Sequence, residues 1–404
     1  MRMDFDDGFY EAATAFCPAP AADNADRLAR LRLVRSRRVG PATFRRMLAE
    51  HGNAIAALAA LPEVARAAGV AEYAACPEAT ALAEIRAAKR LGARMISLGD
   101  PGYPVRLAQC PDAPPVLWAL GNAGLLGRPL IAMVGTRNAS SLGARMARRL
   151  AEDLSQAGFV VVSGLARGID ALAHRAALQG GTIAVQAGGL DVIYPAENTD
   201  LAHEIAASGL SLSEQPYGLE PRARHFPQRN RIVAGLAKAV IVVEAAARSG
   251  SLITARNAAD YGRDVLAVPG HPMDTRASGC NHLLRDGATL IRSAADVIEA
   301  LGPAADAPAQ PDLPLTAPAD PGAIPTAAPQ RPWRDRAALN ARILDRLGPT
   351  PVAEDQLLRD LALSSGEAAS ELARLELGGR ISRQPGGLIC LGENVPRGSD
   401  AKAR

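Results

Sequence analysis

The stretch that decides the fold of this 404-residue chain reads Phe-Pro-Gln-Arg-Asn-Arg-Ile-Val over residues 226–233, Ala-Val-Ile-Val-Val-Glu over 239–244 and Ser-Gly-Ser-Leu-Ile-Thr over 249–254. The middle segment is a short apolar run, typical of a strand buried on both faces of a sheet. The small glycine and hydroxyl residues that follow predict a tight turn. A lone aromatic and a pair of arginines precede the unit, without an evident nucleophile, base or metal cluster. The stretch therefore predicts a surface that binds an anionic polymer without breaking bonds.

Five more runs of this kind lie along the middle of the chain. They cover residues 130–134, 159–163, 182–187, 210–213 and 264–268, and each is followed by a turn and in most cases by a helical segment. Such alternation predicts an α/β fold with a Rossmann-like, doubly wound, mostly parallel sheet. In sheets of this type a ligand binds outside the carboxyl ends of the strands, at a switch in strand order.

The length of the chain exceeds what one hydrophobic core usually supports, so two or three domains are expected. Residues 303–332 are mostly Pro, Ala and Asp, which favours a semi-extended linker. We expect a disordered tail over 1–24, a helical domain of sterile-alpha-motif or helix-hairpin-helix type over 25–92, the Rossmann-like domain over 93–301, a linker over 302–333, a winged-helix domain over 334–392 and a second disordered tail over 393–404.

The two terminal domains are predicted from periodicity. Residues 36–44 place a Gly-Pro turn between two helical segments, which fits either a phosphate-binding helix-hairpin-helix or an ordinary helix start. The C-terminal part predicts helices over 337–347, 352–358 and 364–377, followed by a hairpin over 380–391, as in a winged helix. Its third helix is acidic where a recognition helix would be basic, which favours contact with protein over reading of a duplex.

Charge and cysteine usage restrict the class of protein. The net charge of +3 is too small to indicate nucleic acid by itself, but lysine occurs only at Lys89, Lys238 and Lys402, so nearly all positive charge is guanidinium. Arginine holds phosphate well, although a GC-rich genome would produce the same composition. The five cysteines form no CxxC pair, the first residues are acidic and no long apolar run occurs. We therefore expect a cytoplasmic protein without zinc, disulfides, signal peptide or membrane insertion.

The candidate binding residues fall at the expected strand ends. Small residues there let a phosphate approach the backbone, and helix starts offer unpaired amides. Arginines around one exposed phenyl ring suit single-stranded nucleic acid, because they supply charge for the backbone and a flat face for a base. The alternative is a buried Phe226 with Arg229 or Arg231 as an internal ion-pair partner. The expected set is Gly135, Thr136, Arg137, Arg167, Arg222, Arg224, Phe226, Arg229, Asn230, Arg231, Arg248, Ser249 and Gly250.

Catalytic and cofactor sites are not predicted. Asp170 and His174 stand four apart and could share a metal, but no third ligand is near in sequence. No serine lies in a GxSxG elbow, and Glu244 fits either a base or the partner of a rim arginine. The loops lack a GxGxxG fingerprint, which disfavours a dinucleotide cofactor. We expect no catalytic residue, no metal and no cofactor.

Taken in order, these strings resemble the DNA processing protein A (DprA, or Smf) family over about residues 99–300. The resemblance rests on Gly-Asp-Pro-Gly-Tyr-Pro at 99–104, Val-Gly-Thr-Arg at 134–137, Ser-Gly-Leu-Ala-Arg-Gly-Ile-Asp at 163–170, Gly-Gly-Leu-Asp with Tyr-Pro at 188–195, Phe-Pro-Gln-Arg-Asn-Arg-Ile at 226–232, Ser-Gly-Ser-Leu-Ile-Thr-Ala at 249–255 and Val-Pro-Gly with Gly-Cys-Asn at 268–281. It implies a homodimer that binds single-stranded DNA and loads a RecA-type recombinase during natural transformation. It further implies DNA contacts at Arg137 and Phe226, with Arg229 and Arg231 in the same motif. The family's lysine position is Ala223 here, between Arg222 and Arg224.

Two other functions share a sheet of this type. A phosphoribohydrolase of the lysine decarboxylase-like family would require a Pro-Gly-Gly-x-Gly-Thr string followed by glutamate, which residues 248–254 lack. A nicotinamide-dependent oxidoreductase would require the missing glycine fingerprint.

Overall fold

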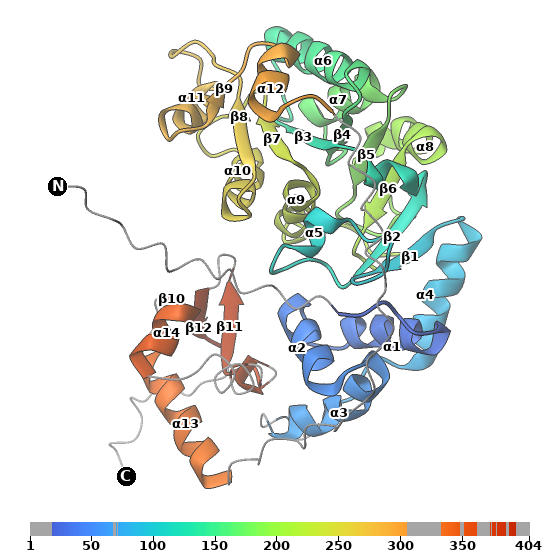
Figure 1. Ribbon diagram of the computed structural model, residues 1–404, viewed down its shortest axis with the longest axis vertical. Helices are drawn as coiled ribbons and strands as arrows, with labels where there is room; N and C mark the ends of the chain where they lie inside the picture. Colours follow the sequence, from blue (N-terminus) through green and yellow to red (C-terminus); the bar gives the residue numbers. More distant parts are fainter. Residues whose placement is uncertain are drawn as a thin grey trace, which may run out of the picture.

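A computed structural model describes residues 18–67, 70, 72–304, 333–347, 351–361, 372, 374–376, 378–384 and 388–392. In these residues a group of N-terminal helices precedes a nine-stranded sheet with helices on both faces, and a small winged-helix part follows (Figure 1). The expected C-terminal tail, most of the expected linker and residues 1–17 of the expected N-terminal tail lie outside the described residues. Residues 18–24, which the sequence placed in a disordered tail, are ordered instead, because the Ala21 amide donates to Asp100 Oδ1 at 3.2 Å and a helix begins at Asn24. None of the described helices is both long enough and apolar enough to cross a bilayer.

The central sheet has the strand order β1-β2-β6-β5-β4-β3-β7-β8-β9. The strands are β1 (Arg94–Ser97), β2 (Val116–Gly121), β3 (Leu130–Val134), β4 (Val160–Ser163), β5 (Thr182–Val185), β6 (Leu210–Ser213), β7 (Ala239–Val242), β8 (Asp264–Ala267) and β9 (Thr289–Leu290). Pairing is parallel from β6 through β9, whereas β2 is antiparallel to both β6 and β1. The prediction of a doubly wound, mostly parallel sheet is confirmed, and β3 to β8 are the six runs expected from the sequence.

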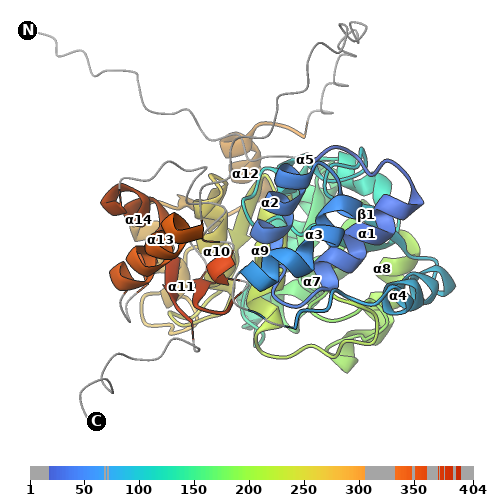
Figure 2. The ribbon, with the colours of Figure 1, turned by 90° about the horizontal axis from the view of Figure 1, so that it is seen from below.

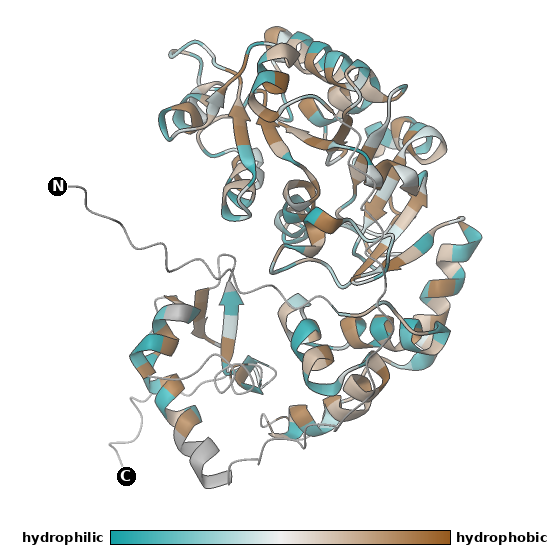
Figure 3. Ribbon diagram, in the orientation of Figure 1, coloured by the Kyte–Doolittle hydropathy of each residue, from teal (hydrophilic) through white to brown (hydrophobic). Residues whose placement is uncertain are grey.

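Helices cover both faces of the sheet because successive strand residues point to opposite sides. Leu130, Ala132 and Val134 of β3 join one apolar cluster, and Ile131 and Met133 join the other. The first cluster lies under α5 (Val105–Ala108), α9 (His225–Leu236), α10 (Ser251–Asp260) and α11 (Ser278–Arg285); the second lies under α6 (Ser141–Gln156), α7 (Ile169–Ala177) and α12 (Ala294–Leu301). In Figure 3 the strands in the middle of the sheet are coloured mainly brown, for hydrophobic residues. Each fully buried side chain of this kind contributes roughly 1.5–3 kcal/mol.

Three shorter elements connect these layers. The helix α8 (Thr199–Ser208) packs on Ala184 of β5, on the same face as α6 and α7. Two 3-10 helices, η1 (Ala123–Gly127) and η2 (Ala196–Asn198), follow β2 and precede α8 respectively.

The N-terminal part is helical, as expected, and consists of α1 (Asn24–Arg35), α2 (Pro41–His51), α3 (Ala54–Ala67) and α4 (Glu78–Arg90). Asp23 caps α1 by accepting a hydrogen bond from the Asp26 amide, and Pro41 opens α2 after Gly40. These helices lie together beyond the β1 edge of the sheet (Figures 1 and 2).

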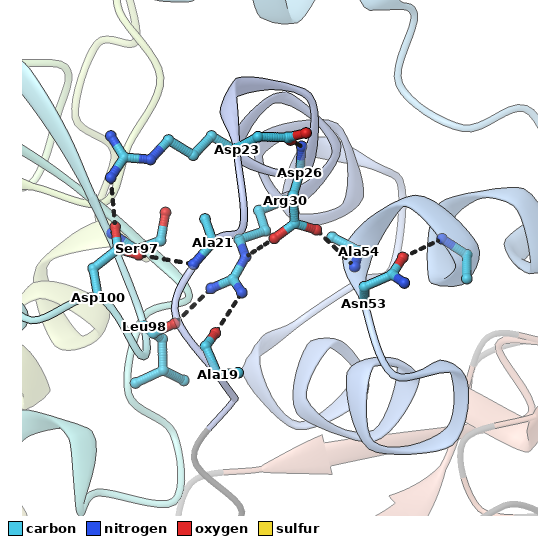
Figure 4. A network of polar contacts seen from close by, with 12 residues as sticks. Ala19, Ala21, Asp23, Asp26, Arg30, Asn53, Ala54, Ser97, Leu98 and Asp100 are labelled. Carbon is cyan, nitrogen blue, oxygen red and sulfur yellow. Dashed lines mark hydrogen bonds and ion pairs between the residues drawn. The ribbon is translucent and has the colours of Figure 1, made fainter. Parts of the chain in front are cut away.

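A buried arginine joins this helical part to the sheet (Figure 4). Arg30 is 2% exposed and its Nε donates to Asp26 Oδ2 at 3.0 Å. Its other nitrogens donate to the carbonyl of Leu98, just after β1, at 2.7 Å and to that of Ala19 at 2.6 Å. Asp26 also accepts the Ala54 amide at the start of α3 at 3.0 Å. One ion pair thus connects α1, α3 and the sheet edge.

The C-terminal part comprises α13 (Trp333–Arg346), β10 (Val352–Ala353), α14 (Glu354–Leu361), β11 (Ile381–Gln384) and β12 (Leu388–Leu391). The hairpin of β11 and β12 is confirmed, and β10 adds a third strand in the order β10-β12-β11. The helix expected over 352–358 begins two residues later, because Val352 pairs with Ile389 in this small sheet. Most of the helix expected over 364–377 lies outside the described residues.

Candidate nucleic-acid interface

A small pocket opens at the carboxyl ends of β3, β4 and β5; we call it the rim pocket. It is lined by Arg137, Gly164, Ala166, Arg167, Tyr194, Pro195, Phe226 and Arg229. The strand order reverses between β3 and β7, so the rim pocket lies beside that switch instead of on it. The strand ends are nevertheless the edge at which the sequence predicted a ligand.

An aromatic pair and a guanidinium form the exposed part of the rim pocket. The Cζ atom of Arg137 lies 5.2 Å from the centroid of the Phe226 ring, within the range of a cation–π contact. The ring of Tyr194 lies 5.6 Å from that of Phe226, centroid to centroid, and is tilted by 56°. Arg137 and Tyr194 are exposed and Phe226 is half-buried. The alternative of a phenyl ring sealed in the core does not apply.

Arg229 forms the floor of the rim pocket, one helical turn from Phe226. It is 5% exposed, and its Nη1 donates to the Val185 carbonyl at 3.0 Å. Its guanidinium lies directly against Gly164, where a Cβ atom would come within 1.5 Å of Nη1. Burial lowers the pKa of Arg229, an effect that the nearby Asp170 carboxyl opposes. Its Nε has no hydrogen-bond partner in the described part of the chain.

The loop between β4 and α7 is held by two buried side chains of α7. Asp170 Oδ2 accepts the amides of Gly164 at 3.2 Å and Ala166 at 3.4 Å, and His174 Nε2 accepts the amide of Leu165 at 3.3 Å. Burial and the charge of Arg229 lower the pKa of His174 to about 3, so the imidazole is neutral and can accept this hydrogen bond.

On its other side, His174 Nδ1 faces Thr182 Oγ1 at 2.7 Å, and that hydroxyl donates to the Val161 carbonyl at 2.9 Å. With Nε2 as the acceptor, Nδ1 carries the proton and donates to the hydroxyl. Among the described residues no three His, Cys, Asp or Glu side chains are grouped to hold a metal ion. Asp170 and His174, whose spacing also suited a metal pair, hold the β4–α7 loop through the hydrogen bonds described above.

Backbone hydrogen bonds join the loops that follow β3, β4 and β7. The Thr136 amide donates to the Glu244 carbonyl at 2.7 Å, and the Ile169 amide donates to the Thr136 carbonyl at 3.2 Å. Gly168 has a φ of +73°, and a Cβ atom there would lie 2.3 Å from the Thr136 oxygen. Gly135 packs against Ile169 in the same way. Gly135 and Thr136 thus connect the loops beneath Arg137.

The start of α6 is occupied by a side chain of the protein itself. Glu244 is 6% exposed; its Oε2 accepts the Ser140 amide at 2.9 Å, and its Oε1 lies 3.6 Å from Arg276 Nε. Ser140 Oγ in turn accepts the Gly143 amide at 2.9 Å. Five of the amides that the sequence offered to a phosphate are therefore engaged within the protein: carboxylates, a hydroxyl and an imidazole accept the hydrogen bonds of Ser140, Gly143, Gly164, Leu165 and Ala166.

The remaining cationic candidates are exposed with one exception, and of these only Arg167 lines the rim pocket. Arg222 and Arg224 are exposed just before α9, and Arg248 is exposed on the loop after β7. Arg167 faces Glu197 at 3.4 Å in an exposed pair, which is worth little in water. On the β7 loop, Ser249 contacts the Ser251 hydroxyl, and Asn230 donates to the Gly250 carbonyl at 3.3 Å.

Arg231 is the exception, and its expected place in the site is corrected. Its side chain is 13% exposed and pairs with Glu214, while Asp112 lies 4.0 Å from Nε. Both carboxylates raise the pKa of Arg231 in spite of its burial. Positions two apart on a helix point about 200° apart, so Arg231 cannot face the same side as Arg229. The alternative of an internal ion-pair partner holds for this residue.

Known proteins share this architecture. Models for DNA recombination-mediator protein A, for a DprA-like N-terminal HHH domain and for a DprA winged helix domain match residues 94–302, 24–87 and 325–387 respectively. The chain belongs to the DNA recombination-mediator protein A family. The DprA of Streptococcus pneumoniae is 48% identical over 50% of this chain and 72% of its own, and the Smf protein of Synechocystis is 38% identical over 71% and 77%.

Structural similarity agrees with this assignment. The X-ray structure of Streptococcus pneumoniae DprA matches with a TM-score of 0.52 and 40% identity, covering 59% of this chain and 86% of that one. Membership in the DprA family places the chain in DNA recombination. The nucleotide-cleaving alternative is not favoured: Glu244, its candidate base, is buried and hydrogen-bonded.

Sequence reasoning left four residues of the rim pocket out of the predicted site, namely Gly164, Ala166, Tyr194 and Pro195. Tyr194 and Pro195 line the pocket, yet the sequence shows them only as part of a turn after the third apolar run. Their position after a parallel strand was the available signal, because the ends of neighbouring parallel strands meet at one edge.

Proposed function

We propose that this DprA family member binds single-stranded DNA at the rim pocket without cutting it and passes the strand to a RecA-type recombinase during natural transformation. The observation that carries the proposal is Arg137 lying over the ring of the half-buried Phe226, beside Tyr194. An aromatic face accepts any base by stacking, and a guanidinium neutralises a phosphate. A single strand exposes its bases for such contact, whereas a duplex keeps them stacked.

The proposed binding is non-enzymatic. The polar groups beneath the rim pocket are committed to holding its loops, as the contacts of Asp170, His174 and Glu244 illustrate. We also propose that the protein works as a homodimer in the cytoplasm. The buried, unpaired cysteines Cys76, Cys110 and Cys280 support a reducing compartment, and burial raises the pKa of the last two to about 11.

Two substitutions test the site by fluorescence anisotropy with labelled oligo-dT over a salt series. Phe226→Ala should weaken binding about 5- to 150-fold, since stacking is worth roughly 1–3 kcal/mol per base. Arg137→Ala should weaken binding and make the slope of log K against log salt shallower by about 0.7, because one phosphate fewer is neutralised on a single strand.

The matched control is Arg90→Ala, which removes an exposed arginine from α4, away from the rim pocket, and should leave the slope unchanged. Melting temperatures of all variants should stay close to the parent. Parental affinity in Phe226→Ala and Arg137→Ala would refute the site. Release of free base from nucleoside monophosphates, abolished by Glu244→Gln, would refute the non-enzymatic proposal.

A further inference from the structure

The outer surface of α6 and α7 is strongly basic and begins directly below the rim pocket. Its cations are Arg145, Arg148 and Arg149 on α6 and Arg175 on α7, all exposed; we call this surface the arginine face. Arg149 forms an ion pair with Asp153, one turn along the helix, at 3.7 Å. In the described part of the chain the other three have no carboxylate within 4.0 Å.

Helical geometry places these side chains on one surface. Gly143, Ala147, Leu150 and Leu154 of α6 are buried, so this side of the helix faces the sheet. Arg145 lies about 200° around the helix from Gly143 and therefore points away from the sheet. On α7, Ala173 and Ala177 are buried, and Arg175 lies opposite them. The two helices pack side by side over β3 and β4.

Arg148 lies on the flank of α6 that faces α7. It stands two turns before Ser155, and Ser155 contacts Gly180 just beyond the end of α7, where a Cβ atom would come within 2.0 Å of the serine Oγ. Residues seven apart share a helix face. Arg148 and Arg175 are each about 10 Å from the start of their helices at 1.5 Å per residue, so they lie at similar depth below the rim.

Both helices start at the loops that contribute Arg137 and Arg167 to the rim pocket. Guanidiniums therefore continue from the pocket down the outer surface, with Glu152 and Asp153 as the acidic residues of α6. A flexible polyanion held at the rim can follow such a path, because phosphates along a single strand need charge at intervals and no fixed base geometry.

We infer that the arginine face is a second contact surface for single-stranded DNA, which holds the phosphates of the strand as it leaves the rim pocket across α6 and α7. The inference rests on the proposed function. The contacts of the arginine face are assigned to the sugar-phosphate backbone of the strand. They should therefore add affinity without base preference, and only for strands long enough to reach this face.

The test compares the full-length protein with Arg148→Ala/Arg175→Ala on oligo-dT from about 4 to 16 nucleotides, the range of site sizes for such surfaces. The shortest bound oligonucleotide should bind as in the parent. For the longest, affinity should fall, and the slope of log K against log salt should become shallower by about 1.4, since two phosphates lose their partners. Arg148→Lys/Arg175→Lys should restore the parental slope.

The matched control is Arg86→Ala/Arg90→Ala, which removes the same charge from the exposed side of α4. If Phe226→Ala weakens the binding of oligonucleotides of every length but Arg148→Ala/Arg175→Ala leaves the binding of the longest oligonucleotide unaffected, the inference fails and the proposed function stands. If Phe226→Ala weakens no length, the proposed function itself fails. A double variant with a parental DNA slope but lost binding to the recombinase would assign the face to an acidic protein and overturn the inference.

Discussion

Arg229 and Arg231 stand two positions apart on α9 and have unrelated surroundings. Arg229 lies under the rim pocket against Gly164, and Arg231 pairs with Glu214 and Asp112 at the other side of the helix. The sequence placed both in one motif and left ion pairing open as the alternative. It could not decide between them, because Asp112 lies 119 positions away and the pairing depends on how β2 and β6 meet.

Gly164→Ala tests how closely Arg229 is packed. The added methyl group would overlap the guanidinium, so Arg229 must move and its hydrogen bond to Val185 is lost. Overpacking of this kind costs about 1–3 kcal/mol, measured as a lower urea midpoint. Gly127→Ala is the control, because no atom lies within 4 Å of its added Cβ and its midpoint should not fall. Equal midpoints in the two variants would contradict the packing described for Arg229.

At the scale of elements, the parallel strands were predictable and the antiparallel edge was not. Strands β3 to β8 are continuous apolar runs because helices cover both their faces. β1 begins with the exposed Arg94 and pairs antiparallel with β2 at the edge of the sheet, so it lacks such a run, and both residues of β9 are exposed. The sequence located the loops that follow these strands. It did not predict the hydrogen bonds within the loops, because these depend on contacts that the spacing of residues along the chain does not specify.

The β4–α7 loop should make stability depend on His174 protonation. The pKa of His174 is about 3 in the folded chain and about 6.5 when exposed, so below pH 6.5 the unfolded state takes up the proton first. The free energy of unfolding then falls as the pH falls from 6.5 towards 3, by up to about 1.4 kcal/mol per pH unit. In His174→Asn this contribution is absent, so its urea midpoint should vary less with pH.

His203→Asn is the control for that series, because His203 is exposed on α8 and its removal should leave the parental pH dependence intact. Midpoints of parent and His174→Asn that run parallel from pH 7 to pH 4 would show that the buried imidazole does not couple folding to pH.

At the scale of the whole molecule, the N-terminal helices are joined to the sheet through Arg30. Arg30→Ala leaves Asp26 buried without its cation and removes the donors to Leu98 and Ala19, a loss of about 3–5 kcal/mol. Arg27→Ala on the same helix removes a half-exposed arginine 3.8 Å from Asp100 and should lose less than about 1 kcal/mol. Hydrogen exchange of α1 to α3 should be faster in Arg30→Ala alone; equal protection in both variants would contradict the anchoring role.

At the rim, the residues that support the loops are different from the residues that project outward, and this separation affects how members of the family can diverge. Main-chain amides of the two loops are engaged by buried Asp170, His174 and Glu244, whereas Arg137 and Tyr194 project outward. Substitutions can therefore exchange the projecting groups while the supporting framework is left undisturbed. Substitutions of the projecting residues could in this way change the affinity and strand preference of the proposed DNA site without lowering the stability of the fold.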